Sequence, residues 1–236
     1  MIVKIMSFNT QHCLNYLENK IDYPLFAKTI AESGADVIGL NEMRDEGERE
    51  GFDPQVRILS ELSGIENHYF ARAIFYRGNN PYGNGLLSKY KIVKAETIPI
   101  PDPDPATRTA GGYYETRCIL KAKLENGLTV MVTHFGLNKD EQESAVKTVI
   151  ENMDPEKCVL MGDFNVIPGD DILVPLRMRM KDTANTFTTP KLSFPSDKPD
   201  RKIDYIFATP DVELISADIP DLVVSDHRPH TAEIKI

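Results

Sequence analysis

The chain has 236 residues, of which 41% are hydrophobic and 27% are charged, and this ordinary globular composition predicts one compact domain over residues 1–236. Its 27 basic and 36 acidic side chains give a formal charge of −9, which argues against a protein that holds nucleic acid mainly by neutralising phosphates. Three widely spaced cysteines, no charged-then-apolar leader and no apolar run near eighteen residues argue against a disulfide framework, a zinc knuckle and a membrane span, so we expect a cytoplasmic protein.

Three segments, residues 22–34, 53–64 and 140–153, carry apolar side chains at helical spacing. The first two begin with an aspartate and a proline and end at a glycine, which are common signals for the start and the end of a helix. In the second segment, we expect Leu62 to share the buried face with Leu59. The sequence therefore predicts three amphipathic helices.

Apolar runs between and after these helices predict strands, and Asn126-Gly127 between two such runs predicts a hairpin. Strands that alternate with helices are typical of an α/β domain. The expected strands cover residues 2–8, 37–40, 68–76, 91–100, 115–124, 128–133, 158–162, 203–207 and 222–224.

Two proline-rich segments, residues 99–113 and 188–201, are predicted to be loops because proline interrupts both helices and central strands. Loops of this length are often functional lids or binding loops, and plain surface loops are the alternative for both segments. The basic pair Arg201-Lys202, which directly follows the second loop, has the pattern of a solvated surface.

Six separated fragments place a polar group with affinity for metals or phosphate at or near the end of an expected strand. Polar groups from separate strands can converge at one edge of an α/β sheet. Oxygen and imidazole groups in such a position indicate a site for a hard cation and a phosphate group. The fragments are Ser7-Phe8-Asn9, Leu40-Asn41-Glu42, Thr133-His134, Gly162-Asp163-Phe164-Asn165, Ile203-Asp204-Tyr205-Ile206 and Ser225-Asp226-His227-Arg228-Pro229.

In this order the six fragments resemble the endonuclease/exonuclease/phosphatase superfamily, and the resemblance spans residues 3–236. It is strongest to the branch that holds deoxyribonucleases, sphingomyelinases and inositol phosphatases. The resemblance implies a four-layer α/β sandwich, in which two mixed β-sheets pack face to face and helices flank them. Periodicity alone predicts only alternating strands and helices.

Glu42 is the first candidate metal ligand, because Mg²⁺ binds one or two carboxylates while it keeps several waters. The alternative is an exposed glutamate at the start of the acidic stretch 45–50. The resemblance adds Asp226 on the metal side and implies that Asn9 is an outer-shell or second-metal ligand. We expect Mg²⁺ or Mn²⁺ as the cofactor.

Asp163 and Asn165 are one residue apart, so in an extended segment they point to the same side. A carboxylate there can take a proton from water while an amide holds the water or a phosphoryl oxygen; an Asx-rich turn is the alternative. The resemblance supports these roles. It also implies that His227 faces the phosphate and that Asp204 orients His227.

His134 resembles a general acid that protonates the leaving oxygen in the deoxyribonuclease-like branch, and a neutral core histidine is the alternative. Arg117 resembles an arginine that contacts the substrate phosphate, for which its planar guanidinium is suited. The partner of His134 is left open. The family's usual Leu-Gln-Glu is here Leu-Asn-Glu, which leaves the surroundings of Glu42 open as well.

Together these residues predict a divalent-metal-dependent phosphohydrolase that cleaves a phosphodiester or phosphomonoester with water. The acidic balance favours a small phosphate ester over DNA or RNA, although a nuclease with the same mechanism is an alternative, since bound divalent cations can offset the carboxylate charge. A catalytically silent module that binds a phosphorylated ligand or a protein partner is the other alternative. We expect a monomer.

Overall fold

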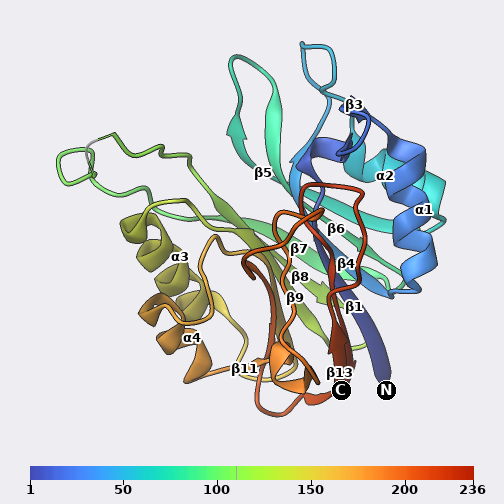
Figure 1. Ribbon diagram of the computed structural model, residues 1–236, viewed down its shortest axis with the longest axis vertical. Coiled ribbons are helices and arrows are strands. Elements are labelled where there is room, and N and C mark those ends of the chain that lie inside the picture. The colour runs from blue at the N-terminus through green and yellow to red at the C-terminus, as the bar shows by residue number, and fades with distance from the viewer. Residues whose placement is uncertain (110) are drawn as a thin grey trace.

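The computed structural model describes residues 1–109 and 111–236, and in these residues two six-stranded mixed sheets form the centre of the fold (Figure 1). The first sheet has the strand order β13-β14-β1-β4-β6-β5, with bounds β13 Glu213–Asp218, β14 His230–Lys235, β1 Ile2–Asn9, β4 Val37–Arg44, β6 Pro81–Ser88 and β5 Asn67–Phe75. The second has the order β11-β12-β10-β9-β8-β7, with bounds β11 Lys181–Asp182, β12 Asp204–Ala208, β10 Cys158–Asp163, β9 Thr129–His134, β8 Cys118–Leu124 and β7 Ile92–Pro99. The short strands β2 Leu14–Asn15 and β3 Lys20–Ile21 form a separate pair.

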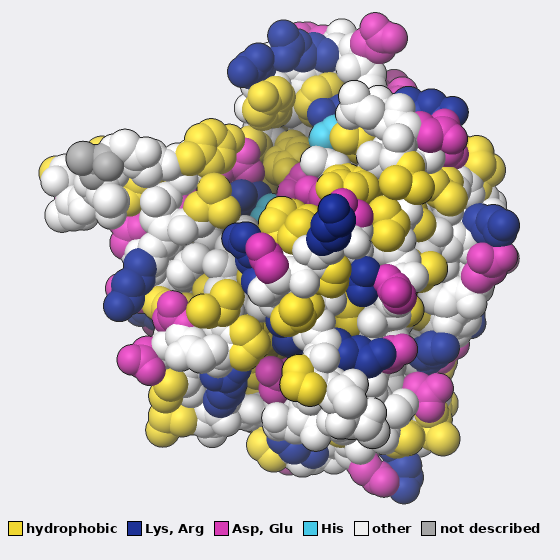
Figure 2. Space-filling view, viewed as in Figure 1, with side chains coloured by type: hydrophobic (Ala, Val, Ile, Leu, Met, Phe, Trp, Pro, Cys, Tyr) yellow, Lys and Arg dark blue, Asp and Glu magenta, His cyan; other side chains and the backbone are white. Residues whose placement is uncertain are grey.

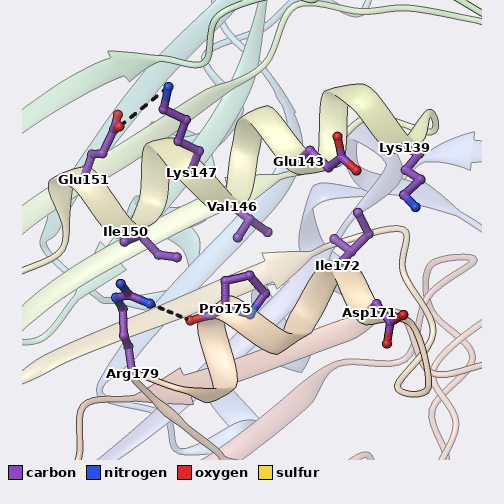
Figure 3. Close-up of a pocket in the computed structure, with 10 residues that line it drawn as sticks. All are labelled: Lys139, Glu143, Val146, Lys147, Ile150, Glu151, Asp171, Ile172, Pro175 and Arg179. Carbon is purple, nitrogen blue, oxygen red and sulfur yellow. Dashed lines mark hydrogen bonds and ion pairs between the residues drawn. The ribbon is translucent and has the colours of Figure 1, made fainter.

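Helices cover the outer face of each sheet, so the expected four-layer α/β sandwich is confirmed. Helices α1, Tyr23–Ser33, and α2, Gln55–Ser63, lie against the first sheet (Figure 1). Helix α3, Lys139–Asn152, and the short helix α4, Val174–Arg177, lie against the second. A close-up of the groove between α3 and α4 shows Val146 and Ile150 facing the α4 side (Figure 3).

The two faces of each central strand belong to different hydrophobic cores. In β1, Val3 and Ile5 lie in the core between the sheets, whereas Met6 and Phe8 lie in the core beneath α1 and α2. In β10, Met161 faces the other sheet and Leu160 faces the core beneath α3. Because side chains alternate along a strand, strands covered on both faces read as continuous apolar runs.

The three long helices lie where the sequence predicts them, within two residues at each end. The Asp22 carboxylate accepts a hydrogen bond from the Leu25 amide at the start of α1 (3.1 Å), and Gly34 ends the helix with φ 68°. Gly64, with φ 74°, ends α2. The expected place of Leu62 in the core is wrong: it is 55% exposed, whereas Leu59 is buried.

The sequence analysis missed strands whose amino-acid composition is not typical of a strand. No sequence pattern indicated β6, which contains a proline and two glycines; a Cβ on Gly83 would lie 2.0 Å from the Ala71 carbonyl oxygen, so a close backbone approach requires glycine there. Strands β13 and β14 were also missed. The strand expected at residues 222–224 is wrong, because this segment is irregular and Leu222 is exposed.

Strand direction explains why the polar fragments meet. Strands β1 and β4 are parallel, as are β9 and β10, so their carboxyl ends point to one edge. Strands β14 and β12 run antiparallel to β1 and β10, which brings their amino ends to that same edge. The two chain termini lie side by side at the opposite edge (Figure 1).

Residues 99–113 form a largely irregular loop that projects from the second sheet, and residue 110 of this expected loop lies outside the described residues (Figure 1). The 188–201 loop is irregular apart from a bridge between Phe194 and Arg201. Among the described helices, none combines the length and the apolar character that crossing a bilayer requires.

Candidate functional site

A pocket of about 470 Å³ opens at the edge where the strand ends meet. Figure 2 shows a hollow at the upper edge of this face, where acidic and histidine side chains gather. The predicted residues Asn9 and Asp204 lie behind the pocket, and the other predicted site residues line it. The lining residues are Glu42, Arg117, His134, Leu137, Asp163, Asn165, Ile167, Phe194, Arg201, Ile203, Asp226 and His227.

His227 lies between two buried carboxylates. Its Nδ1 is 2.9 Å from Asp204 Oδ2, and its Nε2 is 3.6 Å from Asp163 Oδ2. Burial lowers the pKa of His227, but Asp204 and Asp163 outweigh this effect and raise it to about 10. The Phe194 ring packs against the imidazole, with 4.7 Å between ring centroids. The imidazole is therefore held as a cation in a fixed orientation.

Asp163 is almost fully buried and is held on both carboxylate oxygens. Its Oδ1 accepts a hydrogen bond from the Asn165 amide (2.9 Å), and its Oδ2 accepts one from Asn9 Nδ2 (3.1 Å). Burial raises the pKa of Asp163 to about 7; the nearby Asp204 carboxylate adds to this rise and the His227 cation opposes it. A carboxylate with this pKa can exchange a proton near neutral pH.

Glu42 points into the pocket from an irregular part of β4. Its φ is 61°, and the pairing of β4 with β6 shifts register between Leu40 and Met43, as at a β-bulge. Asn9 Nδ2 donates to Glu42 Oε1 (3.0 Å), while Asn9 Oδ1 accepts from the Gln11 amide (3.1 Å). Asn9 therefore turns its NH₂ group toward the carboxylates, and its oxygen is already bonded.

Asn41 joins the two sheets directly behind the site. Its Oδ1 accepts from the Asp163 backbone amide (3.0 Å), and its Nδ2 donates to the Thr133 carbonyl (3.0 Å) and to Asn84 Oδ1 (2.8 Å). Asn84 in turn donates to the Cys118 carbonyl (3.0 Å). All the polar atoms of the buried Asn41 side chain thus serve to hold Asp163 and Glu42 at a fixed separation. The sequence showed an unusual Asn41 but carried no motif for Asn84.

Arg117 is the partner of His134 that the sequence left open. Arg117 Nη1 lies 3.1 Å from His134 Nδ1 and 2.8 Å from Glu115 Oε1. Because a guanidinium only donates, Nδ1 must accept. Asn165 Nδ2, which donates to the Phe135 carbonyl, lies 3.2 Å from Nε2, so both ring nitrogens face donor groups. Burial, with the charges of Arg117 and His227 added, lowers the pKa of His134 well below its ordinary value. Asp163 Oδ2 lies 3.5 Å from His134 Nε2.

The charge of the site fits a divalent cation with oxygen ligands. Atoms of Asp163, Asp204 and His227 lie within 4.8 Å of one another, but both nitrogens of His227 already face carboxylates and carry protons. Glu42 and Asp226 are the remaining carboxylates, and burial raises the pKa of each. A cation bound between them would relieve this cost.

Several pocket residues were not predicted as site residues. Leu137, Ile167 and Phe194 form an apolar part of the lining, and single apolar residues in loops carry no signal in one sequence. Arg201 was expected on a solvated surface; it is exposed but also lines the pocket. The same expectation is wrong for Lys202, which is 5% exposed and has its Nζ 3.3 Å from the centre of the Tyr205 ring.

The sequence model described as the Endonuclease/Exonuclease/phosphatase family matches residues 6–227. Among solved structures, an endonuclease/exonuclease/phosphatase from Beutenbergia cavernae DSM 12333 has a TM-score of 0.80 at 20% identity and is matched over 100% of this chain and 72% of its own. One from Bacteroides vulgatus has a TM-score of 0.76 at 20% identity, with 100% and 99% covered. A mannosyl-6-phosphatase from Bacteroides thetaiotaomicron VPI-5482 has a TM-score of 0.76 at 15% identity, with 99% and 100% covered. A search of curated proteins found no match. At these identities the structural likeness shows the fold.

Proposed function

The chain belongs to the endonuclease/exonuclease/phosphatase family, whose members hydrolyse phosphate esters, and from this membership we propose that it is a divalent-metal-dependent phosphohydrolase that uses water as the nucleophile. The observation that carries the proposal is the buried row formed by Asp204, His227 and Asp163 beside the carboxylates of Glu42 and Asp226. Phosphoryl transfer depends mainly on positioning and on charge stabilisation, and this row supplies fixed charges of both signs.

Glu42 and Asp226 would hold the cation, and their hard carboxylate oxygens suit Mg²⁺ or Mn²⁺. When bound, such a cation neutralises charge on the phosphoryl oxygens and the leaving oxygen. Asn9 orients Glu42 through its NH₂ group, which supports an outer-shell role over direct ligation.

Asp163 takes the proton from the attacking water, for which its pKa of about 7 is suited. His227, as a cation oriented by Asp204, stabilises the negative phosphoryl oxygens. Arg117 adds a second fixed positive charge, and Asn165 positions the water or a phosphoryl oxygen.

The position of His134 supports a role other than the general acid expected from the sequence. In an in-line displacement, the entering and leaving oxygens are on opposite sides of the phosphorus. His134 Nε2 lies 3.5 Å from the proposed base Asp163, and so it is on the side of the entering water. It is also neutral. We therefore assign His134 to the phosphoryl group, where it holds Arg117 and Asn165 in position beside the phosphoryl oxygens, while a solvent proton serves the leaving oxygen.

The presence of the base, both imidazoles and the carboxylates argues against a silent ligand-binding module. The negative charge of the whole chain supports a small phosphate ester over a nucleic acid as the substrate. The mannosyl-6-phosphatase among the structural neighbours is compatible with this choice. A single domain over residues 1–236, a monomeric state and a cytoplasmic location belong to the same proposal.

The test is hydrolysis of bis(p-nitrophenyl) phosphate and p-nitrophenyl phosphate with Mg²⁺, with Mn²⁺ and with EDTA. We expect hydrolysis of at least one ester with metal and none with EDTA. Asp163→Asn should lower kcat by about 10² or more, because loss of a general base typically costs about 10² to 10⁴. The exposed Asp171→Asn serves as the control for the same chemical change. Turnover near the wild-type value in Asp163→Asn contradicts the assignment.

A further inference from the structure

The catalytic pocket has one polar wall and one apolar wall. Glu42 and Asp226 belong to the polar wall, and Leu137, Ile167 and Phe194 belong to the apolar one. Leu137 and Ile167 are 57% and 54% exposed, so both present apolar surface to the pocket beside the charged centre. A phosphate group needs only the polar wall.

The apolar wall continues into a second groove of about 500 Å³. Ile167 and Arg201 line both the pocket and this groove, so the two spaces adjoin. Beyond Ile167, the groove is walled by Pro168 and by residues of the 188–201 loop and the segment before it, including Phe187 and Leu192. The groove is distinct from the one between α3 and α4 in Figure 3, which shares no lining residue with the pocket.

The charged side chains that line the groove are offset by ion pairs or by burial. Lys191 pairs with Asp218, Arg201 pairs with Asp200, and the Nζ of Lys202 is buried. The apolar side chains of the groove therefore determine which organic group it accepts. The guanidinium of Arg201, which lines both spaces, lies 5.5 Å from the centre of the Phe194 ring in the pocket.

We propose that this groove is the subsite for the organic group of the substrate, and that the substrate is a small phosphate ester with an apolar or aromatic organic group. The proposal rests on the proposed function, because the ester phosphate lies in the catalytic pocket. The organic group leaves the phosphate along Ile167 and lies between Pro168 and Leu192. A cavity of this size and lining is typical of small-molecule sites.

The test measures binding by calorimetry in Mg²⁺ with three non-hydrolysable probes: methylphosphonate, phenylphosphonate and biphenyl-4-ylphosphonate. The phenyl ring reaches the apolar wall, and the second ring reaches the groove. We expect Kd to fall about tenfold from methyl to phenyl and about threefold or more from phenyl to biphenyl, because each ring removes apolar surface from water. Equal Kd for all three probes would overturn the proposal.

Two variants locate the contacts. Ile167→Asn should reduce both Kd ratios toward one, and Leu192→Asn should reduce only the phenyl-to-biphenyl ratio. Leu62→Asn is the matched control, because Leu62 is as exposed as Ile167 but lies on α2 outside both spaces. Wild-type ratios in both groove variants also overturn the subsite. Hydrolysis of bis(p-nitrophenyl) phosphate by the wild type is followed in parallel. Equal Kd for the three probes in the wild type, with metal-dependent hydrolysis intact, refutes the subsite alone, whereas absent hydrolysis refutes the proposed function.

Discussion

Replacing Asn41 with aspartate is expected to destabilise the protein and to disturb the site, although the two side chains have nearly the same shape. The introduced carboxylate would still accept from the Asp163 amide, but it could not donate to the Thr133 carbonyl or to Asn84. A negative charge would then face two buried oxygens. Rotating the Asn84 amide does not relieve this, because its Nδ2 already donates to the Cys118 carbonyl.

Each buried polar group left without a partner costs about 1–3 kcal/mol, so two of them give roughly 2–6 kcal/mol. For a chain of this size, 1 kcal/mol shifts the melting temperature by about 2–4 °C, so Asn41→Asp should melt roughly 10 °C below the wild type. Urea unfolding followed by circular dichroism in EDTA measures the free energy of unfolding. kcat should also fall, by about tenfold or more, since Asp163 would lose its fixed position.

Asn126→Asp is the matched control, because its Oδ1 accepts from the Leu128 amide while its Nδ2 makes no hydrogen bond within the described part of the chain. It should change the free energy of unfolding less than Asn41→Asp does, because it removes no hydrogen bond. If the two variants melted within a degree or two of each other, the account of Asn41 as the link between the sheets would be refuted.

Three further outcomes are expected. Millimolar Mg²⁺ or Mn²⁺ should raise the melting temperature, because a cation relieves repulsion between buried carboxylates, and an unchanged melting temperature would contradict the metal site. In a leaving-group series from alkyl to nitrophenyl esters, His134→Ala and His227→Ala should both lower kcat/KM about equally for all esters, since both rings are assigned to the phosphoryl group; a loss in His134→Ala confined to alkyl esters would restore the general-acid role. The pKa of His227 is raised from 6.5 to about 10, so its stabilisation is complete below about pH 6.5 and is lost as pH rises toward 10. In EDTA, the difference in free energy of unfolding between the wild type and His227→Gln should therefore shrink from pH 7 to pH 10.

From the sequence, both the family fold and the convergence of the site residues at one edge could be predicted. This is because metal and phosphate chemistry restricts the residue types at strand ends. Glu42, Asp163 and His227 can be identified in this way from the sequence alone as candidate site residues. No such chemistry restricts the residues of strand β6. Its Gly83 is required by the close approach of the β5 backbone instead. The irregular segment 222–224 was mistaken for a strand because a short apolar run does not reveal whether it has a strand partner.

Contacts between the sheets could not be predicted from the sequence. Asn41 and Asn84 are 43 residues apart, and their hydrogen bond depends on how β4 and β6 pair at a bulge. The exposure of Leu62 has a similar origin, because helical spacing defines a face but not its width. Hydrogen bonds between distant strands and the exposed width of a helix face depend on how whole elements pack, and no short sequence motif predicts them.

The two imidazoles of the site show how packing assigns chemistry to identical side chains. His134 and His227 each direct Nε2 at the same oxygen of Asp163, at 3.5 and 3.6 Å. The difference is the group behind each ring: Arg117 stands at Nδ1 of His134, and Asp204 stands at Nδ1 of His227. A donor behind the first ring keeps it neutral, and an acceptor behind the second keeps it charged.

This asymmetry gives Asp163, the proposed base, a neutral neighbour and a charged one. The charged His227 lowers the pKa of Asp163 against the effect of burial, so the carboxylate can lose its proton near neutral pH. A second cation in place of neutral His134 would lower that pKa further and weaken the base, because the strength of a base falls with its pKa. A second neutral ring in place of His227 would leave the buried carboxylate protonated. The pairing of one donor and one acceptor behind the two rings therefore keeps Asp163 in the range that a general base requires.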